Sequence, residues 1–439
     1  MKKAISRILY LFLLGFVAVL LFSCAMIVVR QLDKNDRNTG NSTTLISIGD
    51  ETSIFHRKID ELTLSSGDIS QKDEKRGLKS LSSASERELY TLLEKNVYNI
   101  SDNVNNDNRF TTERAKLEGT RLSEESIVRS INAFLFDNPE IFWLDNLFGY
   151  GYSDDSTYVE CYSVLSAKRC EECIDIFSKE IDKILAVTDA SDSEYVREKK
   201  IHDKLLEKCS YADNVYSISD GWQYFSAYGA IVDGSAVCEG YSKAMQLLLN
   251  KAGIDSCTVR GTADNVKHMW NYVRIDGKWY HLDATWDENG GNTIYDYFNV
   301  STEMISSNHQ PSQLASEAED YDGALDNMNF YIPVCDFLDM NYYYVEGIVV
   351  SRIDDNTEKY IVSYIVSQAR SGGKSIPIYI SNDADYEETR EQLLGENGSS
   401  FFRYIRSANA VLDDANKISE KSIGINSNAE RRTLRIDLR

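Results

Sequence analysis

Proline is scarce in this chain, with 4 residues among 439, and this scarcity excludes collagen-like and proline-rich architectures. Basic residues are also fewer than acidic residues. The 47 Lys and Arg residues stand against 69 Asp and Glu residues, so the formal net charge is −22. Because contacts to nucleic-acid phosphates need a basic footprint, we expect no nucleic-acid partner. The bulk of the chain is likewise a poor match for an anionic membrane surface.

Apolar residues, in contrast, are sufficient for packed cores. Hydrophobic residues make up 42% and aromatic residues 11% of the chain, which excludes a wholly disordered protein. A length of 439 residues corresponds to roughly two or three domains. The mixed patterns predict an α+β fold, with helices at 85–93, from 123 and at 194–209, and strands at 141–144 and 158–164.

The first thirty residues predict a membrane anchor. Lys2, Lys3 and Arg7 precede an apolar run from Ile8 to Val29, and about 20 apolar residues are enough to span a bilayer. Basic residues before the run and an acidic composition after it predict that the N-terminus stays inside and the remainder lies outside.

Two alternatives to an uncleaved anchor stay open. Leu21-Phe22-Ser23-Cys24 is similar to a bacterial lipoprotein signal, in which Cys24 would carry the lipid. A simple cleaved signal peptide has a shorter apolar region, of about 7–15 residues. All three interpretations export the chain, so we expect a membrane-anchored protein on the extracytoplasmic face, at the cell surface.

Residues 31–83 are dominated by Asn, Asp, Ser, Thr, Gly and Lys, and few apolar residues repeat at any period. Such a stretch cannot bury enough surface to offset the entropy of ordering it. We therefore expect a flexible stalk that separates the membrane from a globular part beginning near residue 84.

Eight cysteines constrain the thiol chemistry of the chain. Without Cys24, seven remain outside the apolar segment, and because seven is odd, at least one free thiol is expected even if all the others pair. Cys170-Glu171-Glu172-Cys173 has a metal or redox spacing, but no second such pair and no His pair accompanies it. A disulfide or two ordinary thiols is favoured there over zinc, and we expect no metal and no cofactor.

The segment from Asp233 to Asp287 carries the strongest signal of chemistry. After the Asp233-Gly234 turn, apolar residues recur at helical spacing, and Gly253 follows as a residue just past a helix C-terminus would. Cys238 therefore falls in the first turn of a largely buried helix, where the helix dipole favours a thiolate. Considered alone, a cysteine at a helix start is more often part of a core.

A β-hairpin is expected after this helix. Segments 268–275 and 278–285 are rich in strand-forming residues and flank Asp276-Gly277, the strongest two-residue hairpin signal. This turn sets the register, and the expected pairs are Ile275–Lys278, Tyr272–His281, Trp270–Asp283 and His268–Thr285.

Alternation along the two strands puts His268, Trp270, His281 and Asp283 on one face of the hairpin. His268 and Asp283 are then diagonal neighbours whose side chains can meet. A carboxylate there would orient one imidazole nitrogen, and a helix packed on this face could bring the Cys238 thiol to the other nitrogen. His281 is the competing imidazole, but it shares a strand with Asp283, so its geometry toward that carboxylate is less natural. A lone strand histidine beside a tryptophan is usually structural.

Three motifs in this segment together resemble the transglutaminase-like superfamily, a papain-related group with nucleophile, His and Asp in that chain order. The resemblance implies a Cys238 nucleophile, a His268 general base and an Asp283 orienting acid. It also implies a papain-like α+β core, in which the helix of the nucleophile packs on an antiparallel sheet. The matching motifs are Val237-Cys238-Glu239-Gly240-Tyr241-Ser242, His268-Met269-Trp270-Asn271-Tyr272-Val273 and Gly277-Lys278-Trp279-Tyr280-His281-Leu282-Asp283-Ala284-Thr285-Trp286-Asp287.

The resulting prediction of domains has five parts. They are an anchor or lipoprotein signal at 1–30, a flexible stalk at 31–83, an accessory α+β region at 84–180, the transglutaminase-like catalytic core at 181–310, and a second accessory α+β region at 311–439.

The second accessory region has its own predicted elements. Strands are expected at 342–345, 360–366 and 376–380, and helices at 385–394 and 400–405. We found no nucleophile, metal cluster or phosphate loop in its sequence, so we expect it to support the core or select its substrate.

The function implied by the resemblance is thiol-dependent acyl transfer or hydrolysis on amide groups, through a thioester. The expected partners are protein or peptide substrates, with cell-wall peptides among the candidates, and the membrane through the N-terminal segment. The rival class is a non-catalytic surface module for adhesion or assembly that retains the fold. An intact triad argues against that class, since a scaffold has no need for all three groups.

Overall fold

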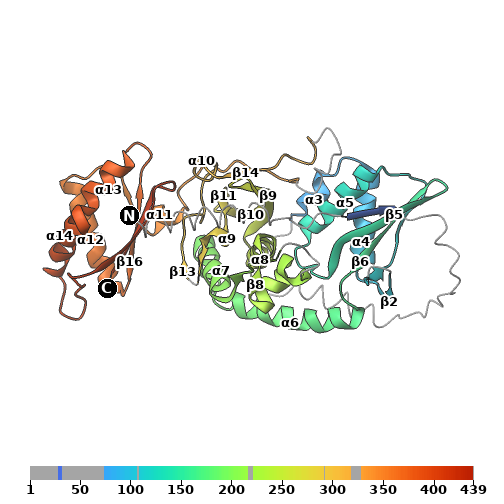
Figure 1. Ribbon diagram of the computed structural model, residues 1–439, viewed down its shortest axis with the longest axis horizontal. Coiled ribbons are helices and arrows are strands. Elements are labelled where there is room, and N and C mark those ends of the chain that lie inside the picture. The colour runs from blue at the N-terminus through green and yellow to red at the C-terminus, as the bar shows by residue number, and fades with distance from the viewer. Residues whose placement is uncertain are drawn as a thin grey trace. The chain divides into compact units, whose positions relative to one another are not determined.

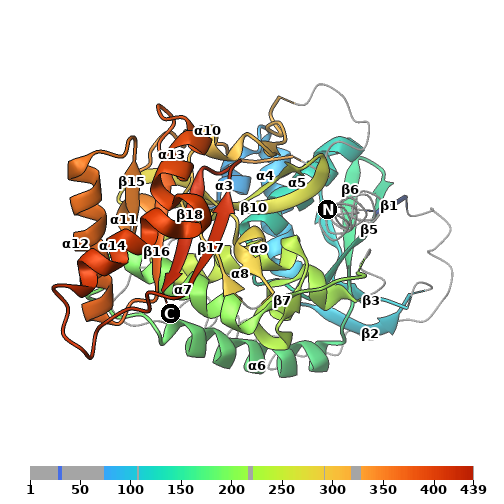
Figure 2. The same ribbon diagram turned by 60° about the vertical axis from the view of Figure 1, so that its left-hand side comes forward.

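The protein divides into two compact units, drawn in Figures 1 and 2. Unit 1 contains the described residues up to Ile294 together with Asn308–Cys335, and unit 2 contains Tyr295–Ser307 and the chain from Asp336 onward. Both units mix helices with largely antiparallel sheets, as expected for an α+β protein. The predicted limits of the five domains stay predictions. The structure, a computed structural model, describes residues 28–31, 74–105, 108–215, 221–290, 292–317 and 328–438.

The N-terminal part of unit 1 is a six-stranded sheet. The strand order is β1-β5-β6-β3-β2, and β4 also pairs with β6. The strands are β1 (Val28–Gln31), β2 (Ile100–Val104), β3 (Phe110–Thr112), β4 (Ala115–Leu117), β5 (Leu144–Ser153) and β6 (Ser156–Ser163). The helices of this part are α3 (Arg76–Ser80), α4 (Ala84–Asn96), α5 (Glu124–Asp137) and α6 (Ala167–Leu185).

Most sequence predictions for this part are confirmed. Helix α4 begins where expected, because Ser83 and Glu86 form a capping box around its first turn. Helix α5 follows Ser123, whose side chain accepts a hydrogen bond from the backbone N–H of Ser126. The strand predicted at 141–144 was placed too early, since β5 begins only at Leu144.

The predicted anchor lies almost entirely outside the described residues. Of residues 1–30 the structure describes only 28–30, which belong to β1. In the described ranges, no helix is both long enough and apolar enough to cross a membrane. Residues 32–73, most of the predicted stalk, also lie outside the described residues.

Helix α3 lies near the end of the predicted stalk and is docked on the core of unit 1. The Arg76 guanidinium donates hydrogen bonds to both carboxylate oxygens of Asp255, at 2.8 and 2.6 Å. It also lies over the rings of Trp279 and Tyr331, 5.0 and 4.7 Å from their centroids. Such a bidentate pair against aromatic faces is a specific packing contact, so folded structure extends at least as far back as Arg76.

The core of unit 1 is a four-stranded antiparallel sheet with the order β11-β10-β9-β14. Helix α8 (Cys238–Lys251) packs against β9 and β10, and α7 (Glu194–Lys208) packs against α8. Figure 1 shows α8 and α7 below β9, β10 and β11. The strands are β9 (Asp255–Ala263), β10 (Val266–Ile275), β11 (Lys278–Leu282) and β14 (His309–Pro311).

Shorter elements complete unit 1. They are β7 (Ser210–Tyr211), a 3₁₀ turn (Trp222–Phe225), a π-helical turn (Gly229–Asp233), β8 (Ser235–Ala236), α9 (Ala284–Asp287), β12 (Glu288–Asn289) and β13 (Asn292–Thr293).

The turn of the predicted hairpin is confirmed. Asp276 and Gly277 have φ angles of 47° and 82°, and two consecutive positive φ angles are what a tight hairpin of this kind needs. The pairs Ile275–Lys278 and Tyr272–His281 form as predicted.

The far end of the hairpin was predicted wrongly. The ladder stops at the pair Asn271–Leu282, so the expected pairs of Asp283 and Thr285 do not form. Asp283 is instead the N-cap of α9, and its carboxylate accepts hydrogen bonds from the N–H groups of Thr285 and Trp286. A capping carboxylate therefore ends the strand at a point where the aromatic pattern alone favours its continuation.

Unit 2 has a four-stranded sheet with the order β15-β16-β18-β17. Its apolar core is shared with α12, α13 and α14, which Figure 1 shows in orange and red. The elements are α10 (Thr302–Ile305), α11 (Tyr342–Val345), β15 (Ile348–Val350), α12 (Asp355–Ser371), β16 (Ser375–Ile380), α13 (Tyr386–Leu394), a 3₁₀ turn (Glu396–Gly398), α14 (Ser399–Asn409), β17 (Ile423–Asn428) and β18 (Thr433–Leu438).

Two strand predictions in unit 2 are wrong. Residues 342–345 form α11, and residues 360–366 lie inside α12. The run of β-branched and aromatic residues suggested a strand, but Asp354 caps the helix start and Gly372 (φ 77°) ends it. The caps and the longer helical period therefore outweigh the local β propensity. The predicted strand at 376–380 and the predicted helices at 385–394 and 400–405 are confirmed.

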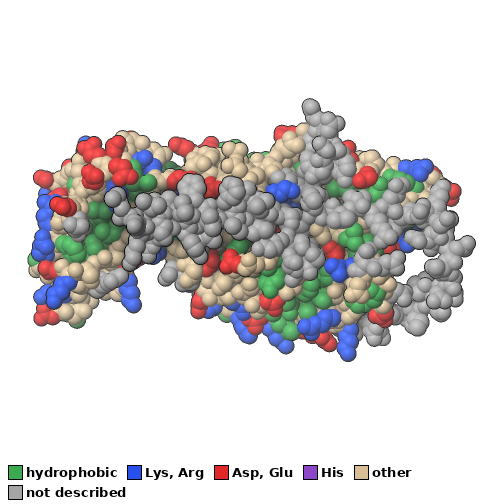
Figure 3. All heavy atoms as spheres, viewed as in Figure 1, with side chains coloured by type: hydrophobic (Ala, Val, Ile, Leu, Met, Phe, Trp, Pro, Cys, Tyr) green, Lys and Arg blue, Asp and Glu red, His purple; other side chains and the backbone are tan. Residues whose placement is uncertain are grey.

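Charged side chains of both signs are spread over the visible described surface of each unit in Figure 3. Helix α6 illustrates this, because Arg169 pairs with Glu172 and Lys183 pairs with Glu180 along its exposed side. On this face the net charge of −22 is therefore not gathered into a single acidic patch.

Candidate active site

Cys238 is the first residue of α8 and is buried, with 2% of its surface exposed. The preceding Val237 is extended and offers no side chain to cap the helix. The first N–H groups of a helix have no partner within it, so the start of α8 presents a positive field to a thiolate at this position. The predicted location of Cys238 in a helical first turn is confirmed.

Helix α8 and strand β10 are tied together next to Cys238. The hydroxyl of Ser242, one turn along α8, lies 2.8 Å from the carbonyl oxygens of both Cys238 and Met269. The side-chain amide of Asn271 donates to the carbonyl of Ser242 at 2.9 Å. Because Met269 directly follows His268, these contacts hold the start of α8 beside the strand that carries His268.

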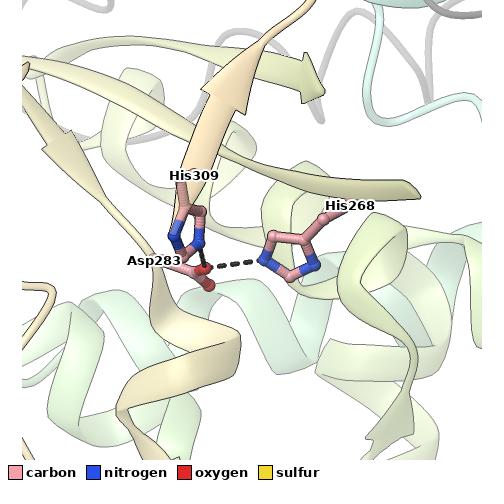
Figure 4. Close-up of side chains that lie close together, drawn as sticks. All are labelled: His268, Asp283 and His309. Atoms are coloured by element: carbon pink, nitrogen blue, oxygen red, sulfur yellow. Dashed lines mark hydrogen bonds and ion pairs between the residues drawn. The ribbon is translucent and has the colours of Figure 1, made fainter. Parts of the chain in front are cut away.

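His268 and Asp283 are in direct contact, as Figure 4 shows. Nε2 of His268 lies 2.6 Å from Oδ2 of Asp283, and the other ring nitrogen points away from the carboxylate. Both residues are buried. The His268 ring stacks on Trp270 at an interplanar angle of 17°, which restrains its orientation. The structure therefore brings together the His–Asp pair that the sequence predicted.

Asp283 has both carboxylate oxygens engaged. Oδ1 accepts from the backbone N–H groups of Thr285 and Trp286 at 3.0 and 3.2 Å, and Oδ2 faces His268 and His309. Burial alone would raise the pKa of Asp283, but the two histidines hold that pKa well below its ordinary value. The buried carboxylate is therefore ionised and stabilises positive charge on the imidazoles around it.

His309 is a contact of this site that the sequence interpretation missed. Its Nε2 lies 2.9 Å from Oδ2 of Asp283, and its Nδ1 lies 2.7 Å from Oδ1 of Asn308. It is placed by β14, the edge strand whose first pair is His309–Ala263. The chain has only five histidines, which is the one signal that could have drawn attention to it. β14 is only three residues long, and residues of unit 2 separate it from β9 in the sequence. No sequence pattern predicts that these two strands pair.

His281 lies on the same face of the hairpin but contacts a different group. The indole Nε1–H of Trp270 donates to Nδ1 of His281 at 3.0 Å, so a neutral His281 ring carries its proton on Nε2. Both residues are almost fully buried. This contact gives His281 a structural role in supporting Trp270, the ring on which His268 stacks.

The seven cysteines among the described residues are free thiols. Cys170 and Cys173 lie one turn apart on α6 and are both buried. Burial raises the pKa of Cys209 and of Cys257 to about 12, so these two thiols stay protonated at neutral pH.

A further buried histidine holds the helix that follows Asp283. His202, on α7, places Nε2 3.3 Å from Oδ2 of Asp287 and Nδ1 3.2 Å from Oδ1 of Asp203. Asp287 is the last residue of α9, whose first N–H groups bind Asp283. Burial alone would lower the pKa of His202, but the hydrogen bonds and charges of the two aspartates raise it to about 9.

We expect the stability of the protein to fall as pH rises from about 6.5 to about 9. The folded-state pKa of His202 lies above its ordinary value of 6.5, so its stabilising charge is complete below pH 6.5 and is lost through pH 9. The effect on the free energy of unfolding is about 3 kcal/mol. Urea unfolding across this range should show the decline, and His202→Gln should flatten it. The same slope in both proteins would contradict this assignment.

Comparison with known proteins places this site in a recognised domain. Residues 183–284 match the transglutaminase-like superfamily. The matched residues include Cys238, His268 and Asp283, so unit 1 contains a transglutaminase-like domain, while His309 lies beyond the match. No curated protein gave a significant match to the chain.

Three solved structures were also found by similarity of fold. One is a TGase, with 16% identity and a TM-score of 0.25, covering 41% of this chain and 53% of that one. The second is a proposed cysteine protease from Cytophaga hutchinsonii, with 16% identity and a TM-score of 0.20, covering 30% and 52%. The third is a proposed protease from Parabacteroides distasonis, with 12% identity and a TM-score of 0.22, covering 38% and 45%. The chain thus spans about half the length of each.

Proposed function

We propose that the protein is a thiol enzyme that transfers or hydrolyses the acyl groups of protein or peptide amides. In this proposal Cys238 is the nucleophile, His268 is the general base and acid, and Asp283 orients the imidazole. The observation that carries the proposal is the 2.6 Å contact between His268 and a buried, ionised Asp283, beside the helix that begins at Cys238. A buried carboxylate needs fixed partners. Here one partner is the imidazole of His268, on a strand that packs against the helix beginning at Cys238.

The proposed reaction follows from the two ring nitrogens of His268. Nε2–H donates to Asp283, which leaves Nδ1 to take the proton of the Cys238 thiol. The thiolate attacks the carbonyl carbon of an amide, and the imidazolium then protonates the leaving amine, so that a thioester forms. An amine that attacks this thioester forms an isopeptide bond, and water forms a carboxylic acid. Either step regenerates the Cys238 thiol.

The proposed place of action is the outer face of a membrane, with the N-terminal segment as tether and proteins or cell-wall peptides as substrates. This part rests on the sequence of residues 1–30, whose basic and apolar pattern is typical of export. Cell fractionation should find the chain with the membrane, and external protease should digest residues beyond 31. Full-length protein in the cytosol would refute export, whereas a lipid on Cys24 would select the lipoprotein alternative.

Alkylation tests the nucleophile without any knowledge of the substrate. In the native protein, Cys238 should react with iodoacetamide at pH 7 at least about tenfold faster than Cys209 or Cys257. The start of α8 and the imidazole favour the Cys238 thiolate, whereas burial raises the pKa of the other two thiols to about 12. Peptide mass spectrometry measures the three rates. Equal rates would remove the basis for assigning Cys238.

Trapping of the thioester tests the reaction itself. The full-length chain, incubated with candidate protein and cell-wall peptide substrates, should gain an acyl mass on the Cys238 peptide. Cys238→Ala should fold normally and gain none. The product released then distinguishes crosslinking from hydrolysis. With a primary amine added, a crosslinking enzyme releases the amide of that amine, whereas a hydrolase releases the carboxylic acid with or without the amine. A reactive Cys238 that is acylated by none of these substrates would favour a non-catalytic surface module.

A further inference from the structure

Three side chains from three different positions of the core sheet converge on one point. His268 comes from β10, Asp283 from the end of β11, and His309 from β14. One ligating atom from each lies within 4.8 Å of the others, and all three residues are buried. Figure 4 shows both imidazoles directed at the same carboxylate oxygen from different sides. Among the residues that the structure describes, this is the one group of three such side chains with metal-binding spacing.

The contacts of His309 suit either a protonated ring or a neutral ring with a cation bound to Nε2. With Asn308 oriented as it is here, both ring nitrogens of His309 face acceptor oxygens, at 2.7 Å on Asn308 and 2.9 Å on Asp283. A neutral imidazole has a single N–H and satisfies only one of these contacts, whereas an imidazolium satisfies both with its two N–H groups. An ion bound to Nε2 would satisfy both, because Nδ1–H then donates to Asn308 while the Nε2 lone pair binds the ion. Metal-bound histidines usually donate their second N–H in this way.

We propose that His268, Asp283 and His309 form a site for Zn²⁺, with Nε2 of each histidine and Oδ2 of Asp283 as ligands. Two imidazoles and one carboxylate make up a protein ligand set that zinc takes with a fourth position open. Zinc ligands at about 2.0–2.1 Å in a tetrahedron lie about 3.3 Å apart. The present Nε2–Oδ2 separations of 2.6 and 2.9 Å therefore need to open by about 0.7 and 0.4 Å.

The surroundings of the three ligands suit a rigid metal site. Trp270 packs against both imidazoles, with ring centroids 5.9 Å from His268 and 5.1 Å from His309. Trp286 also packs edge-to-face with His309, with ring centroids 4.7 Å apart. An aromatic shell of this kind limits access of water to the ligands and fixes the orientation of the rings.

Binding of Zn²⁺ would stop the proposed reaction, and this step alone rests on the proposed function. When Nε2 of His268 binds the ion, the ring proton moves from Nε2 to Nδ1 and no oxidation or reduction occurs. Nδ1 is the nitrogen that takes the thiol proton of Cys238 in catalysis. The metal-bound and catalytic states of His268 are therefore mutually exclusive, and zinc acts as an inhibitor.

Zinc binding can be measured without activity. The full-length chain, freed of metal with a chelator, is titrated with Zn²⁺ in competition with a chromophoric zinc indicator. We expect about one equivalent to bind, and His309→Phe to weaken binding by at least about 100-fold, more than the loss of an outer-shell partner. His281→Phe is the matched control, because it replaces a buried imidazole of the same sheet outside the cluster, and it should keep the affinity. Unchanged binding in His309→Phe would overturn the proposal.

Two further measurements keep the outcome clear. Cys238→Ser should retain zinc, and loss of zinc in this variant would place the ion on the thiol instead. X-ray absorption on the unsubstituted protein should show nitrogen or oxygen ligands at about 2.0–2.1 Å from the zinc ion. Sulfur ligands at about 2.3 Å would overturn the proposed site. This measurement needs no variant, so it remains decisive even if His309→Phe fails to fold. If zinc binds but Cys238 is unreactive, the proposed enzymatic function is wrong and the zinc site stands. If Cys238 is reactive but zinc does not bind, the zinc site is wrong and the proposed function stands.

Discussion

His268→Ala should slow acylation of Cys238 by about 10²–10⁴-fold, whereas His281→Ala should keep most of the rate. His268 contacts Asp283 through Nε2 at 2.6 Å, so its Nδ1 remains for the thiol proton. Nδ1 of His281 is already the acceptor for the indole of Trp270, at 3.0 Å. Single-turnover measurements of thioester formation compare the two variants directly.

Loss of stability should follow the opposite order to loss of rate. His281→Ala leaves the buried N–H of Trp270 without its acceptor, which costs about 1–3 kcal/mol in the free energy of unfolding. Urea unfolding of both variants measures this cost. If His281→Ala abolished acylation while His268→Ala stayed active, the general base would be misassigned.

The sequence was informative wherever a local rule determines the structure. The Asp276-Gly277 turn fixes the register of β10 and β11, because a two-residue turn leaves no freedom for slippage. The start of α8 at Cys238 follows from the turn before it and from helical spacing after it. The register was enough to predict that His268 and Asp283 meet, even though two of the four predicted strand pairs are wrong.

The errors arise where two local rules compete. Asp283 is both a residue in an aromatic strand pattern and a good N-cap, and its hydrogen bonds to two backbone N–H groups favour the cap. Residues 360–366 have the composition of a strand, yet they lie inside α12, where Ile361 and Ile365 are buried one turn apart. A longer window that includes Asp354 and Gly372 would have favoured the helix.

The contribution of His309 lies beyond any local rule. It reaches Asp283 because β14 pairs with β9, and between β9 and β14 the chain includes a segment of unit 2. Contacts between residues so far apart in sequence depend on the whole fold. Local propensity places α8 and the hairpin but gives no information on which short segment closes the edge of the sheet.

Asp283→Asn should reduce acylation by about 10⁴-fold while the protein stays folded. The asparagine oxygen can still accept from the N–H groups of Thr285 and Trp286, which keeps the start of α9. Its NH₂ group, however, would face Nε2 of His268 and of His309, where the carboxylate oxygen now lies. A donor at this point requires lone pairs on both Nε2 atoms and therefore moves the imidazole protons to Nδ1.

A His268 ring with its proton on Nδ1 cannot take the proton of the Cys238 thiol, so the loss of rate follows from the wrong tautomer and not from a missing contact. Asp287→Asn is the matched control, because it makes the same change in the same short helix but faces His202. It should lower stability and keep most of the acylation rate. Equal losses of rate in the two variants would show that α9 as a whole, and not the charge of Asp283, supports the reaction.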